Sequence, residues 1–292
     1  MTEQPGLFWS WRPPLPTRFD NDESARATHE RRRRDYHAQV ASQCWAWLEG
    51  SLGKPMVLGI QGPQGSGKST LAAAMVEAAM ARGVRACAVS IDDFYLTHDE
   101  QLALATRHSG SPYLRYRGYP GTHDIGLGVR TLAELRADGP PGRVEVVAYD
   151  KSAHAGRGDR APRERWRSVQ VPLDLLILEG WMLGFAPVAP ETIEPALHAP
   201  NTYLAAYAAW THMLDALIHL DVASLDTVVA WRVDAERARR AAGESALSDE
   251  DARDYIERCL PAYRAYVPGL SAEPPTRQFI RIELGPDRLP AI

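Results

Sequence analysis

Residues 62–69 read Gly-Pro-Gln-Gly-Ser-Gly-Lys-Ser and match the phosphate-binding pattern G-x-x-x-x-G-K-S, called the P-loop below. The match lies between the apolar run 56–60 and the Ala-rich stretch 70–80, which gives the order strand, loop and helix. In that order the glycines let backbone N–H groups surround a phosphate chain, and the helix directs its positive N-terminal end at the same anion. A glycine-rich turn that matches the pattern by chance would not be expected to lie between a strand and a helix. The pattern therefore predicts a nucleoside triphosphate site within an α/β fold.

The positions of the P-loop have expected parts in binding ATP. Lys68 would reach the β- and γ-phosphates, and the Ser69 hydroxyl would be a ligand of Mg²⁺. Lys68 is also a candidate catalytic residue, because a cation there offsets negative charge on the phosphoryl group in transit. The residues expected to contact ATP are Gly62, Gly65, Ser66, Gly67, Lys68, Ser69 and Thr70.

The composition narrows the class of protein. At 292 residues and 45% apolar content, the chain can bury the core of one large α/β domain with appendages. Its formal charge of −4 disfavours a general nucleic-acid binder, which usually carries a basic excess. The three cysteines are odd in number and far apart, so they predict no disulfide framework. No run approaches ~20 apolar residues and no basic-then-apolar leader is present, so we expect a cytoplasmic protein that does not bind membranes.

The chain divides into an N-terminal arm and helix, residues 1–52, and a kinase-like domain, residues 53–292. After the first strand and helix, short β-like runs alternate with helical or irregular segments. These runs cover residues 84–91, 143–149, 173–178, 216–220, 227–232 and 279–282. Such alternation predicts a P-loop NTPase fold of the α/β class, with a mostly parallel sheet and helices on both faces.

The longest connection in the domain is residues 97–142. It is rich in Arg, Tyr and Gly, and its only clear helical stretch is residues 129–137. Connections of this length are uncommon in a compact domain unless they bind something. We therefore expect this insertion on the acceptor side of the site.

Two strand ends supply carboxylates. Asp92 and Asp93 close the second strand, and Glu179 ends the apolar run 175–178. Ligands of an open α/β sheet bind outside the carboxyl ends of the strands, so these side chains should face the P-loop. Asp92 is the candidate base that takes the proton of an acceptor hydroxyl, and Glu179 would stand near Mg²⁺. For Asp93, helix capping and acceptor binding are open alternatives.

Seven motifs follow one another in the chain: residues 62–70, 90–95, 118–124, 149–152, 156–160, 179–185 and 231–232. Together they resemble the D-glycerate 3-kinases, which are P-loop kinases related to uridine kinase, phosphoribulokinase and bacterial pantothenate kinase. The resemblance implies that Asp92 is the base, that Glu179 is associated with Mg²⁺, and that Asp124 and Tyr149 bind the acceptor. It also implies a lid whose arginine contacts the transferred phosphoryl group, with Arg237 and Arg240 as the candidates.

Charge indicates an anionic acceptor. Arginine binds carboxylates through paired hydrogen bonds, whereas uridine offers no anion. The basic residues in the acceptor-like segments are Arg115, Arg117, Lys151, Arg157 and Arg160. The residues expected to bind the acceptor are Asp93, Tyr95, Arg117, Asp124, Tyr149, Lys151 and Arg160.

We therefore expect a kinase that uses ATP and Mg²⁺ to phosphorylate D-glycerate, a small hydroxy acid. The alternative among enzymes is a sibling kinase that acts on another small hydroxyl compound, such as pantothenate or uridine. The alternative from another class is an ATP-binding switch protein without an acceptor. The sequence predicts neither which hydroxyl reacts nor the oligomeric state.

Overall fold

The computed structural model describes residues 23–49, 55–243 and 246–290. Its helices are α1 (Glu23–Glu49), α2 (Lys68–Met80), α3 (His98–Arg107), α4 (Ile125–Arg136), α5 (Ala153–Gly156), α6 (His198–Leu204), α7 (Ala208–Thr211), α8 (Leu225–Ala241), α9 (Asp249–Glu257) and α10 (Leu260–Ala272). Its strands are β1 (Met56–Gln61), β2 (Ala86–Ser90), β3 (Gly142–Val146), β4 (Tyr149–Asp150), β5 (Asp159–Arg160), β6 (Arg167–Val171), β7 (Leu175–Gly180), β8 (Ala216–Val222) and β9 (Gln278–Leu284). Short 3₁₀ turns are η1 (Ile91–Phe94), η2 (Arg163–Arg165), η3 (Pro190–Thr192), η4 (Pro195–Leu197) and η5 (Ala205–Tyr207).

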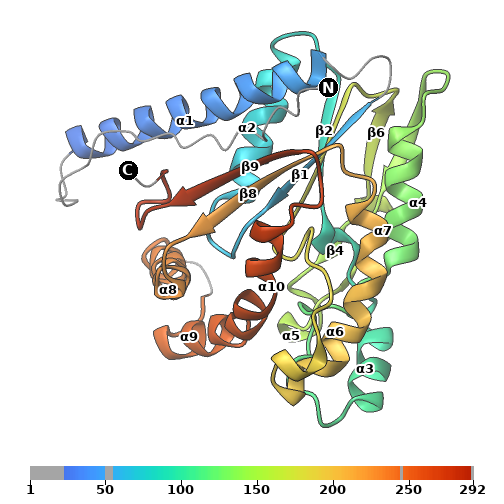
Figure 1. Cartoon of the computed structure of the whole chain (residues 1–292), viewed down its shortest axis with the longest axis vertical. Coiled ribbons are helices and arrows are strands. Elements are labelled where there is room, and N and C mark those ends of the chain that lie inside the picture. The colour runs from blue at the N-terminus through green and yellow to red at the C-terminus, as the bar shows by residue number, and fades with distance from the viewer. Residues whose placement is uncertain (1–22, 50–54, 244–245, 291–292) are drawn as a thin grey trace, which may run out of the picture.

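Five parallel strands form the central sheet in the order β2-β7-β1-β8-β9 (Figure 1). In the register of β1, Gln61 lies opposite Gly180 on one side and His219 on the other. β2 pairs with β7 and places Ser90 opposite Glu179. Because the strands are parallel, the P-loop, Ser90 and Glu179 come together at one edge of the sheet. The predicted α/β fold with a parallel sheet is confirmed.

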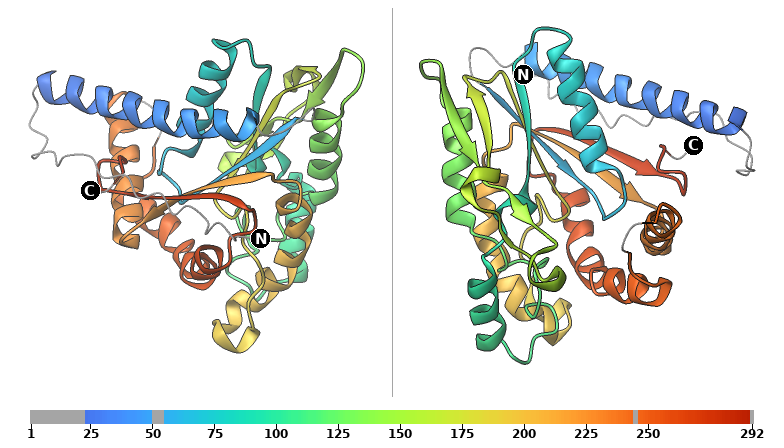
Figure 2. Two further views of the ribbon diagram at one scale, coloured as in Figure 1. Left: turned by 45° about the horizontal axis from the view of Figure 1, so that its top comes forward. Right: turned by 180° about the vertical axis from the view of Figure 1, so that it is seen from behind.

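Helices cover both faces of this sheet, as Figure 2 shows from two sides. Successive strand residues point to opposite faces, so Met56 and Leu58 pack in the cluster that contains α1 and α2. Val57 packs in the other cluster, with α4, α7 and α10. All six residues of β7 are buried, which explains its unbroken apolar run.

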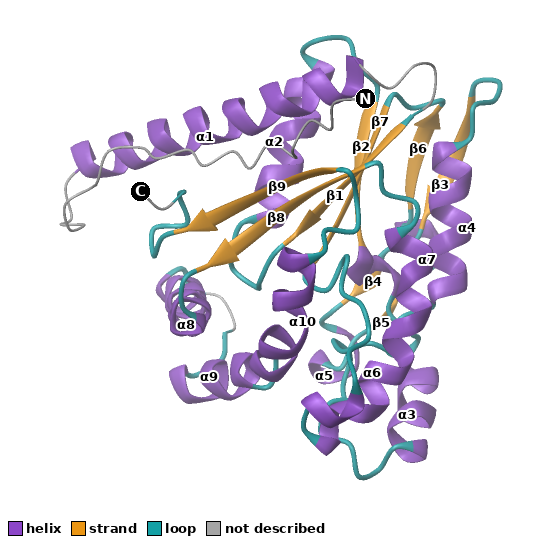
Figure 3. Cartoon of the chain, in the orientation of Figure 1, coloured by secondary structure: helices purple, strands orange, loops and turns teal. Residues whose placement is uncertain are grey.

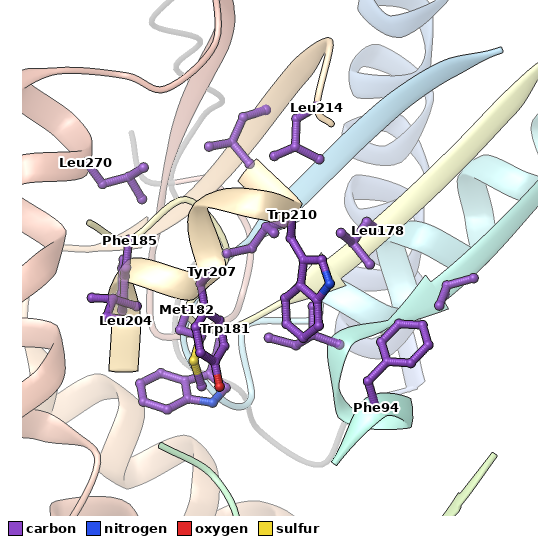
Figure 4. Close-up of a cluster of buried hydrophobic side chains, with 14 of the residues drawn as sticks. Phe94, Leu178, Trp181, Met182, Phe185, Leu204, Tyr207, Trp210, Leu214 and Leu270 are labelled. Atoms are coloured by element: carbon purple, nitrogen blue, oxygen red, sulfur yellow. The ribbon is translucent and has the colours of Figure 1, made fainter. Parts of the chain in front are cut away.

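The larger core lies on the face covered by α4, α7 and α10 (Figure 4). Trp210 is among its largest fully buried side chains, and its ring centroid lies 5.9 Å from that of Phe94 and 5.2 Å from that of Tyr207. Gly128 in α4 permits this packing, because a Cβ there would lie 2.6 Å from Trp210 Nε1. Phe94 ends η1, the turn that carries Asp92. The core therefore holds the candidate base in position.

Two short antiparallel ribbons, β3-β6 and β4-β5, stand beside the central sheet (Figure 3). In the second ribbon Tyr149 lies opposite Arg160. The connection between β4 and β5 contains α5 and carries Lys151 and Arg157. This ribbon brings the predicted acceptor segments to one side of the sheet.

Two expectations from the sequence were wrong. The predicted strand 227–232 lies in α8, because Ser224 caps that helix by accepting a hydrogen bond from Asp226 N at 3.2 Å. The insertion 97–142 contains α3 as well as α4. Thr97 and Glu100 form a capping box that starts α3, a signal of the sequence that the apolar pattern did not reveal.

Cys44, Cys87 and Cys259 are free and buried. Among the described residues, no helix combines the length and apolar character that crossing a membrane needs.

Candidate active site

A cavity of about 750 Å³ lies at the carboxyl ends of β1, β2 and β7. In Figure 1, α8, α9 and α10 lie on one side of this region, and α3, α5 and β4 lie on the other. The P-loop and the strand ends contribute Gln64, Gly65, Lys68, Ser69, Ser90, Asp92, Asp93, Tyr95, Glu179, Gly180 and Trp181. The acceptor segments contribute Pro112, Tyr113, Tyr116, Arg117, Gly118, Tyr119, Tyr149, Lys151, Ala155, Gly156 and Arg157. The C-terminal helical region contributes Arg232, Tyr255, Arg258 and Cys259.

Glycine backbone conformations shape the P-loop. Gly65 and Gly67 have φ angles of 81° and 89°, in the left-handed region that favours glycine. α2 begins at Lys68, so the free N–H groups of its first turn are directed at the loop. Ser66 Oγ is buried and has no hydrogen-bond partner among the described residues. This arrangement of donors fits a phosphate chain.

Lys68 extends across the loop, where its Nζ donates to Pro63 O at 2.9 Å. Burial lowers the pKa of Lys68, and the negative charges of Glu179 and Asp92 oppose that shift. Gly62, Ser66, Gly67 and Thr70 belong to the loop and the first turn of α2 but do not line the cavity.

Ser69 and Glu179 form the candidate metal position. Ser69 Oγ donates to Glu179 Oε1 at 2.9 Å, and the Glu179 side chain is buried. A hydroxyl and a carboxylate fit Mg²⁺, which usually takes one or two protein ligands and completes its shell with phosphate oxygens and water. The described residues contain no cluster of three or more His, Cys, Asp or Glu side chains that could hold a metal ion.

Asp92 pairs with Lys151 inside the cavity. Lys151 Nζ donates to Asp92 Oδ2 at 2.6 Å, and Ser90 Oγ accepts from Asp92 N at 3.2 Å. Burial alone would raise the pKa of Asp92, but the charge and hydrogen bond of Lys151, together with smaller contributions from His123 and Tyr95, outweigh burial and lower it. Burial likewise acts to lower the pKa of Lys151, and Asp92 reverses this and raises it. Asp92 is therefore held as a carboxylate, the form that a base requires.

Asp93 caps a helical turn, one of the two roles that the sequence left open, and acceptor binding stays a prediction. Its Oδ2 accepts from Ser90 N at 3.4 Å in a capping box that starts η1, and the side chain also lines the cavity. Arg167 lies 3.6 Å from it. Burial raises the pKa of Asp93 to about 6.

An aromatic group supports the acceptor side. Tyr95 stacks on His123 with ring centroids 4.3 Å apart and meets the edge of Tyr149 at 5.2 Å. His123 Nδ1 lies 2.7 Å from the hydroxyl of Tyr207. Burial lowers the pKa of His123 to about 3, although Asp92 acts in the opposite direction. A neutral His123 therefore stands behind Tyr95.

The predicted acceptor residues separate into two groups. Arg117 lines the cavity, and its guanidinium donates to the carbonyls of Lys151, Gly156 and Arg157. Asp124 and Arg160 do not line it. Asp124 caps α4 by accepting from Leu127 N at 2.8 Å, and Arg160 lies 3.3 Å from that carboxylate. The structure therefore uses these two residues to hold α4 against β5.

The candidate lid arginines are placed differently from the expectation. Arg237 and Arg240 both pair with Asp249 and join α8 to α9 outside the cavity lining. The arginine of α8 that lines the cavity is Arg232. Its Nη2 lies 2.6 Å from the buried Glu236, and its guanidinium lies over Tyr255 at 4.6 Å from the ring centroid. Sequence reasoning missed Arg232 as a site residue, although residues 231–232 formed part of the family-like pattern.

Comparison with known proteins agrees with this geometry, although no family model matches the chain. The chain is 38% identical over 259 residues to the chloroplastic D-glycerate 3-kinase of Arabidopsis thaliana, covering 87% of this chain and 56% of that protein. It thus spans little more than half the length of that relative. It is 34% identical over 232 residues to the uncharacterized kinase mug58 of Schizosaccharomyces pombe, covering 75% of this chain and 83% of that protein.

A solved structure is similar over nearly its whole length. The D-glycerate 3-kinase from Cryptococcus neoformans superimposes with a TM-score of 0.78 at 29% identity, covering 87% of this chain and 97% of that one. Extensive coverage in both sequence and structure means that the likeness includes the acceptor segments as well as the P-loop. The chain belongs to the same kinase family as mug58, and over most of its length it is similar to the two D-glycerate 3-kinases.

Proposed function

We propose that the protein transfers the γ-phosphoryl group of ATP to a hydroxyl of D-glycerate and so forms phosphoglycerate. The observation that supports this most is the Asp92–Lys151 pair in the same cavity as Lys68 of the P-loop. A held carboxylate beside an ATP-type loop suits transfer to a hydroxyl. The relatives from Arabidopsis thaliana and Cryptococcus neoformans are named for D-glycerate.

In the proposed reaction, Asp92 accepts the proton of the acceptor hydroxyl as its oxygen bonds to the γ-phosphorus. The bond from that phosphorus to the β,γ-bridging oxygen breaks, and ADP leaves with the electron pair. Lys68 offsets the charge on the β- and γ-phosphates. Ser69 and Glu179 would hold Mg²⁺, which when bound neutralises phosphate charge and orients the triphosphate of ATP.

Arg232 is the arginine we assign to the transferred phosphoryl group, in place of Arg237 and Arg240. It lines the cavity and belongs to α8, which lies on the other side of this region from α3, α5 and β4 (Figure 1). Glu236 and Tyr255 fix its orientation, and a preoriented guanidinium stabilises charge that develops in the transition state. We further propose a cytoplasmic location, since the three cysteines are free thiols.

The test is the dependence of ADP formation on the acceptor. Purified protein with MgATP should form ADP rapidly with D-glycerate and slowly with glycerol, pantothenate or uridine. Asp92→Asn should lower kcat about 10²–10⁴-fold, the range typical for loss of a general base, with the KM for ATP little changed. ADP formation that ignores every acceptor would identify an ATPase switch instead. A loss of that size in Asp93→Asn but not in Asp92→Asn would move the base to Asp93.

A further inference from the structure

Three guanidinium groups surround the ring of Tyr116 at the acceptor end of the cavity. Arg115 and Arg157 each lie 5.3 Å from the ring centroid, and Arg258 lies 5.9 Å from it. They come from three separate parts of the chain: the loop before α4, the turn after α5 and the end of α9. Each contact with the ring is favourable, but three like charges around one ring repel one another. Such a group is stabilised by an anion.

The protein itself does not provide that anion. Within the described parts of the chain, none of these three guanidiniums pairs with a carboxylate. The backbones of two of them are nevertheless held in place. Tyr119 donates its hydroxyl proton to the carbonyl of Arg258, and Arg117 donates to the carbonyl of Arg157.

The other cations of the acceptor side already have partners. Lys151 is neutralised by Asp92, and the guanidinium of Arg117 is engaged with three backbone carbonyls. Of the three arginines at Tyr116, Arg157 and Arg258 line the cavity, whereas Arg115 does not. Arg258 donates its Nε–H to the carbonyl of Asp254 at 3.0 Å but, like Arg157, has no carboxylate partner among the described residues. On the acceptor side, the cavity cations that neither a carboxylate nor several carbonyls engage are therefore Arg157 and Arg258.

We propose that Arg157 and Arg258 bind the carboxylate of the acceptor, beside the face of Tyr116. This inference rests on the proposed function and names the part of the site that makes it select a hydroxy acid. Guanidinium groups match a carboxylate through paired hydrogen bonds. Because one arginine follows α5 and the other follows α9, two elements that Figure 3 shows in separate parts of the fold, the bound acid would join the acceptor segments to the C-terminal helices across the cavity. An acceptor that carries a carboxylate would therefore be held in a fixed position for phosphoryl transfer, whereas an uncharged acceptor would not.

The test compares the variants Arg157→Met and Arg258→Met with the control variant Arg115→Met. Arg115 contacts the same ring but does not line the cavity. Each of the first two should raise the KM for D-glycerate about 10- to 100-fold, the effect of losing a hydrogen-bonded charge partner. The KM for ATP should stay within about twofold, because the P-loop holds the nucleotide. Arg115→Met should leave both KM values within about twofold. Arg258→Lys should recover part of the affinity, since it keeps the charge but loses the paired geometry.

The preference for D-glycerate over glycerol is the second measurement. In the Arg157→Met/Arg258→Met double variant, the ratio of kcat/KM for the two acceptors should fall toward one. Equal losses in Arg115→Met would overturn the inference, since they would trace the effect to packing of Tyr116. A rise in the KM for ATP alone would also overturn it and assign the arginines to the nucleotide phosphates. Wild-type protein that ignores D-glycerate refutes the proposed function, whereas selective wild-type turnover with unchanged variants refutes only this inference.

Discussion

Lys151 controls the ionisation of Asp92 through a single contact of 2.6 Å. Together with His123 and Tyr95 it outweighs the effect of burial, which alone would raise the pKa of the carboxyl group. In Lys151→Met only His123 and the hydrogen bond of Tyr95 still oppose burial, so the pKa of Asp92 should rise and the base should become protonated at a higher pH. We expect the acid limb of kcat/KM for D-glycerate to move to higher pH.

The matched control for this prediction is Arg165→Met. Arg165 pairs with Asp150 at 2.7 Å. Asp150 is the residue before Lys151, but neither Asp150 nor Arg165 lines the cavity. Its loss should leave the acid limb in place. An unchanged limb in Lys151→Met would show that Asp92 does not set the pH dependence.

Asp93 should make the fold more stable at low pH. Burial raises its pKa in the folded protein to about 6, while the unfolded chain has an ordinary value of about 3.9. The folded state therefore binds this proton more tightly, and the resulting stability is lost as pH rises from about 4 through 6. Asp93→Asn keeps an oxygen to accept from Ser90 N, yet carries no charge. Denaturant titrations should show it more stable than wild type by roughly 1–2 kcal/mol at pH 8 and nearly equal at about pH 3.5.

A lower free energy of unfolding for Asp93→Asn at pH 8 would contradict this reasoning. It would mean that the attraction between Asp93 and Arg167, 3.6 Å apart, exceeds the penalty of burying the carboxylate.

At the scale of elements, α8 carries arginines with two different tasks. Arg232 lines the cavity, whereas Arg237 holds α8 to α9 through Asp249 at 2.6 Å. Arg232→Met should lower kcat about 10²-fold or more, the effect of removing one preoriented transition-state donor. Arg237→Met, on the same helix, should leave kcat within about twofold and lower Tm slightly, because its ion pair is exposed. Steady-state kinetics and thermal unfolding of the two variants show which arginine contributes to phosphoryl transfer. A larger kcat loss in Arg237→Met would return that role to Arg237, as the sequence predicted.

The elements that could be predicted are those whose local pattern and tertiary environment agree. β7 is apolar throughout because it is buried on both faces, and α2 follows the P-loop directly. The segment 227–232 was misleading, because its β-branched and aromatic residues favour a strand locally. In the fold, Val228, Val229 and Trp231 are buried on α8, so tertiary packing of a capped helix decided its structure.

The same distinction applies to the site. The sequence predicts Lys68, Asp92 and Glu179 as site residues. The first belongs to the P-loop motif, and the other two follow strands whose carboxyl ends face the ligand, a rule that requires only knowledge of where the strands end. Tyr116, Arg232 and Arg258 lie in segments far apart in sequence, and only the packing of α8 and α9 beside the acceptor segments brings them into one cavity. Asp124 and Arg160 belong to acceptor-like motifs but pair with each other, a contact that spacing alone does not reveal.

At the scale of the whole molecule, α1 joins the domain through one buried stripe. Tyr36, Val40, Cys44 and Trp45 are buried against the face that α2 covers. Arg32 also lies 3.3 Å from Asp287, in the loop whose Arg288 donates to Gly65 O at 2.8 Å. The N-terminal helix therefore packs on the same core that supports the P-loop, and the division of the chain at residue 52 stays a prediction that stability measurements test.

Two variants of Tyr36 distinguish how packing and how the polar hydroxyl group contribute to stability at the contact between α1 and the domain. Its side chain is buried, and its hydroxyl has no hydrogen-bond partner among the described residues. Tyr36→Ala should lower the free energy of unfolding by about 3–5 kcal/mol through the cavity it leaves, whereas Tyr36→Phe should be neutral or stabilising because it removes an unpaired polar group. Neither change should alter the KM for ATP or D-glycerate. If α1 shares the core, Tyr36→Ala shifts one cooperative unfolding transition. A separate early transition, with the main one unmoved, would instead establish residues 1–52 as an independent unit.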